Sequence, residues 1–304
     1  MKKVGIVIVN YDTQEATTAL LKSLENLKTK DFEIEKIVVD NGSEKPFDFP
    51  QKSDITLIRL EENTGFSGGF NTGIRKAFES GTDYVLILNS DTTVDPDLII
   101  ELKKVLDSDE KVGAVVPKIY FAKGHEFHKE KYEKKDLGKV IWYAGGFIDW
   151  ANVRSVHRGV DEVDHGQYDE IEKVEFATGC CVLFKKETLE KVGLFDGKYF
   201  LYYEDADLSV RIKKAGFSIY YAPHAFLYHL NASSSGGAGR GNELQDYFIT
   251  RNQMIFGFSY ATFKAKFALT RQAFSLLFNG RPEQKKAIRD FYSGKFGKGT
   301  FFNK

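Results

Sequence analysis

Cysteine is scarce in this chain of 304 residues, which contains only Cys180 and Cys181, adjacent to one another. Two neighbouring cysteines cannot provide the disulfide framework of a small secreted domain, and their spacing matches no zinc-binding motif. We therefore expect two reduced thiols in a cytoplasmic protein, one of them facing the core.

Long hydrophobic runs are also missing. No apolar run reaches the roughly 18 residues that a membrane-spanning helix requires. The apolar part of the N-terminal stretch MKKVGIVIVNYD is too short for a secretory signal and leads directly into a predicted strand. The expectation is a cytoplasmic protein, at most peripherally attached to the inner face of the plasma membrane.

The common phosphate-binding motifs are absent. The glycine-rich stretch that follows Asn63 lacks the Gly-Lys-Ser/Thr ending of a P-loop and contains no GxGxxG pattern. Its glycines would let the backbone approach a ligand or pack closely against a sheet. By itself this stretch therefore identifies no ligand.

The formal net charge is zero, but the charges are distributed unevenly. From Gly236 onward the chain has twelve Lys/Arg and four Asp/Glu, so this part carries about +8. A basic tail predicts an anionic partner, and a membrane surface, a lipid diphosphate and nucleic acid all meet that description.

The same tail has a regular aromatic pattern. A helix is expected over residues 242–278, where aromatic residues recur at helical spacing. They are Phe256, Tyr260, Phe263, Phe267, Phe274 and Phe278. We expect the first half of this helix to pack on the main domain, while the second half, which leads into the basic residues 281–289, resembles an interfacial membrane helix.

Apolar runs and helical patterns alternate along the first two thirds of the chain. Strands are predicted at residues 4–9, 34–39, 55–60, 84–88, 113–117, 174–184 and 218–223. Helices are predicted from Thr13, over 72–80, 98–106 and 186–192, and from Glu204, with an aromatic hairpin or loop at 141–156 and a Ser/Gly loop at 233–237. This order indicates an α/β fold whose mostly parallel central sheet is flanked by helices.

Small polar clusters follow four of the predicted strands. They are Asn10-Tyr11, Asp40-Asn41, Asn63 and Asn89-Ser90-Asp91. Because the carboxyl ends of parallel strands share one edge of a sheet, these clusters should converge on one crevice. The oxygens of Asn89 and Asp91 suit a hard divalent cation such as Mg²⁺ or Mn²⁺, brought by a diphosphate.

A second acidic cluster opens the helix that begins at Glu204. The helix dipole favours acids at this end, which is a sufficient explanation for Asp207. It explains Glu204 and Asp205 less well, because two tyrosines precede them and crowd both carboxylates into a cleft. A carboxylate in a cleft can act as a general base. His229, by its position alone, reads as a packed or surface histidine.

Taken in order, these motifs resemble the family 2 glycosyltransferases, and most closely the bacterial rhamnosyltransferase-like branch. The sequence motifs are VIVNYD, VVDNGS, NTGFSGGFNTG, ILNSDTTVD, TGCCVLF and FLYYEDADLSVR, followed by a histidine. The resemblance implies a GT-A fold and inversion at the anomeric carbon. It implies a GT-A domain over residues 1–235, with a nucleotide-binding half (1–117) and an acceptor-binding half (118–235), followed by a basic, mainly helical extension at 236–304.

The resemblance also implies the residues of a donor site. Asp40 stands where the family's acid contacts a uracil or thymine base. Asn10 and Tyr11 would line the same nucleotide pocket, and Asn63 and Asn71 would lie close to it.

Metal binding and catalysis are assigned to other matching positions. Asn89 and Asp91 occupy the family's Asp-x-Asp, so Asp91 would bind the metal and Asn89 the ribose or the metal's waters. His229 matches a third metal ligand of this branch. Asp205 stands at the position of the base, and Glu204 would hold the acceptor or orient Asp205.

Two positions depart from the family pattern. Asn89 replaces the usual first Asp, which lowers the charge of the metal site. Phe70 stands where many members have an Arg, which removes a diphosphate contact.

The function implied is transfer of a sugar from dTDP-rhamnose or a UDP-sugar to a glycan or lipid-linked glycan in surface polysaccharide biosynthesis. Mg²⁺ or Mn²⁺ is the expected cofactor, the basic tail is expected to contact a membrane surface, and nucleic acid is not expected as a partner. The oligomeric state is left open, with a dimer among the alternatives. There are two rival interpretations. One is a nucleotidyltransferase, which would require a basic Gly-rich loop at the position of Asn10-Tyr11-Asp12. The other is a non-catalytic sugar- or lipid-binding module.

Overall fold

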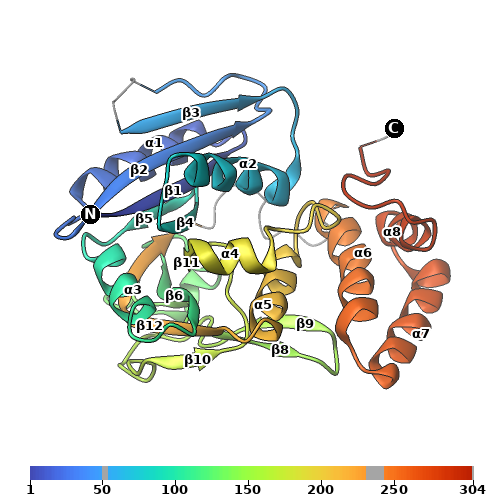
Figure 1. Ribbon diagram of the computed structural model, residues 1–304. Coiled ribbons are helices and arrows are strands. Elements are labelled where there is room, and N and C mark those ends of the chain that lie inside the picture. Colours follow the sequence, from blue (N-terminus) through green and yellow to red (C-terminus); the bar gives the residue numbers. More distant parts are fainter. Residues whose placement is uncertain (50–53, 231–242, 303–304) are drawn as a thin grey trace.

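The computed structural model describes residues 1–49, 54–230 and 243–302. Its centre is a ten-stranded mixed sheet, with a separate two-stranded hairpin (Figure 1). The sheet strands are β1 (Lys2–Asn10), β2 (Phe32–Asn41), β3 (Ile55–Leu60), β4 (Tyr84–Asn89), β5 (Thr92–Val94), β6 (Val112–Phe121), β7 (Ile141–Tyr143), β10 (Glu172–Val174), β11 (Cys181–Lys185) and β12 (Ser218–His229). The hairpin strands are β8 (Gly146–Asp149) and β9 (Arg154–His157).

Along the chain, helices lie between these strands and after the last of them. They are α1 (Gln14–Ser23), α2 (Gly65–Glu79), α3 (Leu98–Leu106), α4 (Lys186–Val192), α5 (Glu204–Lys214), α6 (Glu243–Tyr260), α7 (Phe263–Asn279) and α8 (Pro282–Tyr292), with short 3₁₀ turns η1 (Leu24–Asn26) and η2 (Lys129–Lys131). Figure 1 shows α2 in front of the β1–β2 strands, and α6, α7 and α8 grouped to one side of the sheet.

The main strand order is β10-β12-β6-β11-β4-β1-β2-β3. The strands β3, β2, β1 and β4 pair in parallel, whereas β11 pairs antiparallel with both β4 and β6. Strands β1 and β4 are buried on both faces, which is why their sequences are continuous apolar runs. The α/β architecture with a mostly parallel sheet is therefore confirmed.

Helix α2 begins seven residues earlier than the expected start at residue 72, so the glycine-rich stretch is helix rather than loop. Its glycines let the helix lie very close to the sheet: a Cβ placed on Gly73 would be 2.2 Å from Cγ1 of Val7. Gly65, at the first position, has φ of +76°, and a Cβ there would meet the carbonyl oxygen of Phe200 at 2.3 Å. Close packing, one of the two expected uses of these glycines, is confirmed.

Strand β12 is longer than the expected strand at residues 218–223. It continues through Pro223 to His229, with a register shift against β6 between Ala222 and Phe226. A β-bulge accommodates the extra residues around a proline that cannot donate to the ladder. The extension matters because it carries His229 to the sheet edge. The expected strand at 174–184 is likewise interrupted, with its two ends in β10 and β11.

The C-terminal region is not one helix. The expected helix over 242–278 is broken at Ala261-Thr262, where Thr262 caps the start of α7 by accepting a hydrogen bond from the backbone N–H of Ala265. The aromatic pattern therefore belongs to two helices. Phe256 on α6 is buried, and Phe263 on α7 is 86% exposed.

One sheet connects the predicted nucleotide-binding and acceptor-binding halves, since β4 and β6 are both paired with β11. The division at 235/236 and the Ser/Gly loop at 233–237 fall outside the described residues, so that boundary stays a prediction. Both cysteines are free and buried. Among the described helices, none has the length and apolar character needed to cross a membrane.

Candidate functional site

A cavity of about 550 Å³ opens at the carboxyl ends of the central parallel strands. Residues from every predicted site motif contribute to its wall. Those that were predicted from sequence and line it are Tyr11, Asn63, Asn89, Asp91, Glu204, Asp205 and His229. The expected convergence of strand-end clusters on one crevice is therefore what the structure shows.

Strand register explains the convergence. Asn10, the last residue of β1, pairs with Asp40 near the end of β2, and Val9 pairs with Asn89 at the end of β4. Three chain segments thus stop at the same level of the sheet. Because parallel strands in register end together, the polar residues that follow them lie close to one another.

Asp91 and His229 face one another. His229 Nε2 lies 3.1 Å from Oδ1 of Asp91, and both side chains are nearly buried. The antiparallel pairing of β5 with β12 aligns His229 with Thr92, the residue after Asp91. The bulge and extension of β12 therefore bring together two residues that are 138 positions apart.

These two side chains can provide part of a divalent cation site. A carboxylate oxygen and an imidazole nitrogen both suit Mn²⁺, and Asn89 lines the same cavity. Among the described residues, no group of three or more His, Cys, Asp or Glu side chains is arranged to hold a metal on its own. An ion here would therefore need further oxygens from water or from a bound diphosphate.

Asp205 lies in the first turn of α5 and lines the same cavity. Its Oδ2 accepts a hydrogen bond from the backbone N–H of Gly179 at 3.0 Å, and its Oδ1 accepts one from the N–H of Ala206. Burial raises the pKa of Asp205 to about 6, although these N–H donors oppose the rise. A carboxylate with a pKa near 6 is largely ionised at neutral pH and still basic enough to accept a proton.

Glu204 is buried beside Asp205. Burial first, and the neighbouring charge of Asp205 second, raise the pKa of Glu204 well above its ordinary value. Within the described residues its Oε2 has no hydrogen-bond partner, although the side chain lines the cavity. Burying a carboxyl oxygen without a hydrogen bond costs free energy, so Oε2 is well suited to form a hydrogen bond with a ligand hydroxyl group.

The loop that presents Glu204 and Asp205 is strained. Phe200, Tyr202 and Tyr203 all have positive φ angles, of 62°, 68° and 73°. Non-glycine residues adopt this conformation only when their surroundings impose it. Three such residues immediately before two acids indicate that the loop is held in place from outside.

The hold comes from Asn252 on α6. Its Nδ2 lies 2.8, 2.7 and 2.8 Å from the carbonyl oxygens of Tyr199, Leu201 and Tyr202. The neighbouring side chain, Arg251, is fully buried and donates to the carbonyl of Tyr199 at 3.2 Å. It also donates to Oδ1 of Asn252 at 3.1 Å, which fixes the orientation of the amide. The C-terminal extension thus supports the acidic loop directly.

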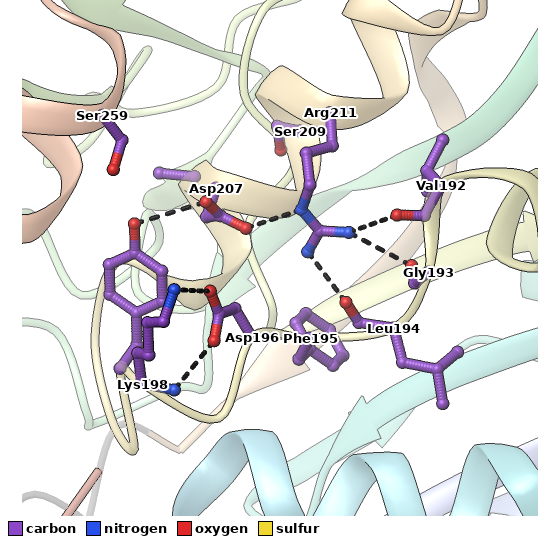
Figure 2. A network of polar contacts seen from close by, with 12 residues as sticks. Val192, Gly193, Leu194, Phe195, Asp196, Lys198, Asp207, Ser209, Arg211 and Ser259 are labelled. Carbon is purple, nitrogen blue, oxygen red and sulfur yellow. Dashed lines mark hydrogen bonds and ion pairs between the residues drawn. The ribbon is translucent and has the colours of Figure 1, made fainter. Parts of the chain in front are cut away.

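Asp207, the third acid, serves the fold. Figure 2 shows it bound to Arg211, whose guanidinium also points at the backbone carbonyls of the 192–194 turn. The Nε of Arg211 lies 2.7 Å from Oδ2 of Asp207, while Tyr260 donates to Oδ1 at 2.6 Å. Asp207 is thereby committed to tying α5 to the preceding turn and to α6, and it does not line the cavity.

Asp40 does not line the cavity, and its carboxylate is already hydrogen-bonded within the protein. It accepts hydrogen bonds from Ser43, the N–H of Phe47, Asn10 and Arg59. Burial alone would raise the pKa of Asp40, but these donors outweigh it and the net shift is downward. The predicted contacts of Asp40 and Asn10 with a nucleotide base stay predictions, since neither side chain lines the cavity.

Asn71 holds two chain segments together, and its predicted place near the nucleotide stays a prediction. Its Nδ2 donates to the carbonyl of Phe195 at 2.8 Å, and its Oδ1 accepts from the N–H of Phe195 at 3.0 Å. Both ends of the amide are used, and the side chain is buried away from the cavity wall. Asn63 and the 40% exposed Tyr11, by contrast, do line the cavity.

Sequence reasoning missed Trp142 as part of this site. The ring of Trp142 lines the cavity and contacts the rings of His229 and His157, with centroids 4.6 and 4.5 Å away. Burial lowers the pKa of His157 to about 4, so this imidazole is neutral near pH 7. The 141–156 hairpin was identified as aromatic, but no local pattern tells which of its rings turns toward a distant histidine.

Comparisons with known proteins bear on the family and the fold. The model of a family described as "Glycosyltransferase like family 2" matches residues 2–242. The low-salt glycan biosynthesis hexosyltransferase Agl10 of Haloferax volcanii is 25% identical over 217 residues, which cover 71% of this chain and 63% of that protein. The poly-beta-1,6-N-acetyl-D-glucosamine synthase of Staphylococcus aureus is 26% identical over 272 residues, covering 80% of this chain and 59% of that protein. The chain thus spans about three fifths of the length of these relatives.

Solved structures share the fold. The crystal structure of GalNAc-T7 with UDP, GalNAc and Mn²⁺ has a TM-score of 0.68 at 16% identity and covers 100% of this chain and 56% of that one. The mannosyltransferase PcManGT of Pyrobaculum calidifontis, in complex with GDP-Man and Mn²⁺, has a TM-score of 0.51 at 16% identity, covering 96% and 74%. At these identities the likeness concerns the fold, which is GT-A.

Proposed function

Because this chain belongs to the family 2 glycosyltransferases, we propose that it is a metal-dependent, inverting enzyme that moves a sugar from a nucleoside diphosphate to a hydroxyl group of a glycan or lipid-linked glycan. The observation that supports this most directly is the shared cavity. The pair Asp91 and His229 and the pair Glu204 and Asp205 line the same cavity. The first pair suits the leaving diphosphate and the second suits the attacking alcohol.

The proposed reaction needs one base and no covalent intermediate. Asp205 accepts the proton of the acceptor hydroxyl as its oxygen attacks the anomeric carbon. The bond from that carbon to the diphosphate oxygen breaks on the opposite face, and its electron pair leaves with the nucleoside diphosphate. A divalent ion, Mg²⁺ or Mn²⁺, held by Asp91 and His229 would supply positive charge for this leaving group. Glu204 would hold the acceptor through Oε2, and its raised pKa favours the protonated form.

The donor we favour is dTDP-rhamnose, with a UDP-sugar as the alternative. The preference for rhamnose comes from the order of the sequence motifs. Asn89 and Phe70, which replace an acid and a basic residue of the common pattern, both line the cavity. Phe70 packs against Phe66 with ring centroids 4.4 Å apart, so the donor side has an apolar corner where many relatives carry a charge.

The acceptor we favour is a growing surface polysaccharide or its lipid-linked precursor. Part of the cavity lining is contributed by the apolar residues Leu201, Leu244, Ile249 and Phe302. Three of these come from the C-terminal region, which therefore helps to build the cavity. An acceptor with an apolar portion, presented at a membrane surface on the cytoplasmic side, matches such a lining.

The test is a panel of nucleotide sugars. The protein is incubated with dTDP-rhamnose, UDP-glucose, UDP-galactofuranose and GDP-mannose, each with and without Mn²⁺ or Mg²⁺, and thermal shift and nucleoside diphosphate release are measured. We expect a metal-dependent shift and release with a dTDP- or UDP-sugar. Formation of a nucleotide sugar from a sugar phosphate and a nucleoside triphosphate would favour the nucleotidyltransferase alternative. Binding without any release or transfer would favour the non-catalytic module.

A further inference from the structure

Helix α7 carries a row of phenylalanines that face away from the protein. Phe263 is 86% exposed, Phe267 60%, Phe274 65% and Phe278 66%. Figure 1 places α7 at the outer margin of the C-terminal helices. Four large apolar side chains this exposed on one helix are unusual for a surface that meets only water.

The four rings form one narrow stripe, named here the phenylalanine stripe. At 100° per residue they fall within an arc of about 60° around the helix axis. The buried residues of α7 are Ala265, Leu269 and Ala273, and they are centred about 150° away. Helix α7 therefore has two apolar faces, one packed on the protein and one free.

The packed face fixes the orientation of the helix. Leu269 fits against Gly257 on α6 so closely that a Cβ at 257 would lie 2.2 Å from its Cδ1. Phe274 and Phe278 pack against each other, with ring centroids 5.1 Å apart. Because Leu269 is locked against α6, the phenylalanine stripe cannot rotate into the core, and its exposure is built into the fold.

Cations border the stripe. Arg271 and Lys264 follow it on one side of the helical wheel and Lys266 lies on the other, and α7 contains no acidic residue. None of the three cations forms an ion pair with any residue in the described part of the chain. Apolar rings bordered by unpaired cations are the arrangement of a helix that lies in the interface of an anionic membrane.

We propose that the phenylalanine stripe of α7 inserts into the headgroup region of an anionic lipid bilayer, with Lys264, Lys266 and Arg271 contacting the lipid phosphates. The occupant is a membrane and not a second copy of this chain, for a reason of charge. A symmetric contact along the stripe would place the three cations of one α7 against those of the other, with no acid on either helix to offset them.

A membrane contact of this kind would add to the proposed function. The inference rests on the proposed function only in assuming that the acceptor is lipid-linked. Helix α7 packs on α6 and α8, and α6 carries both the Asn252 contact to the acidic loop and the apolar residue Ile249 of the cavity wall. The same group of helices would then hold the enzyme on the membrane and contribute to the cavity that receives a lipid-linked acceptor.

Vesicle sedimentation of the full chain, without nucleotide sugar, tests the proposal. The vesicles are phosphatidylcholine with and without phosphatidylglycerol. We expect binding to the anionic vesicles, a loss of at least about tenfold in affinity for Phe267→Ser/Phe274→Ser, and a similar loss for Lys264→Gln/Arg271→Gln. The control Phe147→Ser/Ile171→Ser removes two apolar residues of comparable exposure, 46% and 49%, and should bind like the unchanged protein.

A fluorescent reporter covers the case in which a double variant folds poorly. Phe267→Trp should show a blue shift of its emission on adding anionic vesicles, and Phe147→Trp should not. The proposal is overturned if the unchanged protein does not bind anionic vesicles, or if the stripe variants bind as tightly as it does. Concentration-dependent self-association that Phe267→Ser/Phe274→Ser abolishes, without vesicle binding, would overturn it in favour of a second copy. Since no sugar transfer is measured, these outcomes are independent of the donor and acceptor assignments.

Discussion

The side-chain amide of Asn252 donates to the carbonyl oxygen of Leu201 at 2.7 Å, and through this contact the C-terminal helix α6 controls the loop that leads into Glu204 and Asp205. The loop contains three non-glycine residues with positive φ, a conformation that costs on the order of 1 kcal/mol or more for each residue. Removing the amide should release that strain. We therefore expect Asn252 to be a positioning residue, acting through the acids and not on the substrate.

Asn252→Asp tests this role while preserving the shape of the side chain. A carboxylate cannot donate to the three carbonyl oxygens and would be repelled by them, so we expect kcat to fall by more than about tenfold. The KM for the nucleotide sugar should change little, because the residues assigned to donor binding lie on other elements than α6 and the acidic loop. Asn279→Asp on the exposed end of α7 is the matched control. Equal kcat for the two variants would show that the contact has no part in catalysis.

Asp205→Asn tests the base assignment. The amide cannot accept the acceptor's proton, so we expect turnover to drop by about 10² to 10⁴-fold. The metal-dependent thermal shift by nucleoside diphosphate should remain, because Asp91 and His229 are untouched. Near-normal turnover by Asp205→Asn would mean that another group is the base.

The pH dependence of transfer should follow Asp205. Burial raises the pKa of this carboxyl to about 6, and only the ionised form can accept a proton. The rate should therefore be low below pH 6, rise about tenfold per pH unit as the pH approaches that value, and level off above it. His157, with its pKa lowered to about 4, is already neutral in this range and should not contribute. A rate that does not change between pH 5 and pH 7 would contradict the assignment.

Metal binding should depend on the Asp91–His229 pair. His229→Ala and Asp91→Asn each remove one of the two facing side chains, and we expect Mn²⁺-dependent stabilisation by UDP or dTDP to be lost and turnover to fall by about 10²-fold. His224→Ala is the control, since His224 lies on the same strand but is exposed to solvent. If a chelator leaves the unchanged protein fully active, the pair serves catalysis without a metal.

Asp40 should contribute stability that depends on pH. Its folded-state pKa is lowered, because the donors around it outweigh the effect of burial. Its contribution is therefore present above the unfolded-state pKa near 4 and is lost as the pH falls through the lower folded-state value. We expect Asp40→Asn to lower the free energy of unfolding by about 2 kcal/mol at pH 7. In urea unfolding, the difference from the unchanged protein should shrink steadily as the pH is lowered below 4.

Much of the fold could be predicted because buried strands and strand-end clusters are local patterns. The run from Tyr84 to Leu88 is apolar on both faces and stops at Asn89, which predicts a central strand with a polar end. The predicted helix was shorter than α2, because glycine lowers the stability of an isolated helix. Here the packing of the glycines on Val7 and its neighbours stabilises the helical conformation. The break between α6 and α7 was missed because the aromatic spacing continues across it.

The sequence by itself determined the α/β sheet, the polar edge where its strands end, and the acids Asp91 and Asp205, since each of these depends on residues close together in the chain. Only the tertiary structure decided that His229 faces Asp91, that Asn71 and Asp207 hold the fold together, and that Asn252 supports the acidic loop. Some of these contacts join residues that are far apart in the chain. In others, the sequence contains several possible partners of the same kind, and only the folded structure selects one of them. They are set by strand register, by a bulge in β12 and by the packing of α6, which no local pattern encodes.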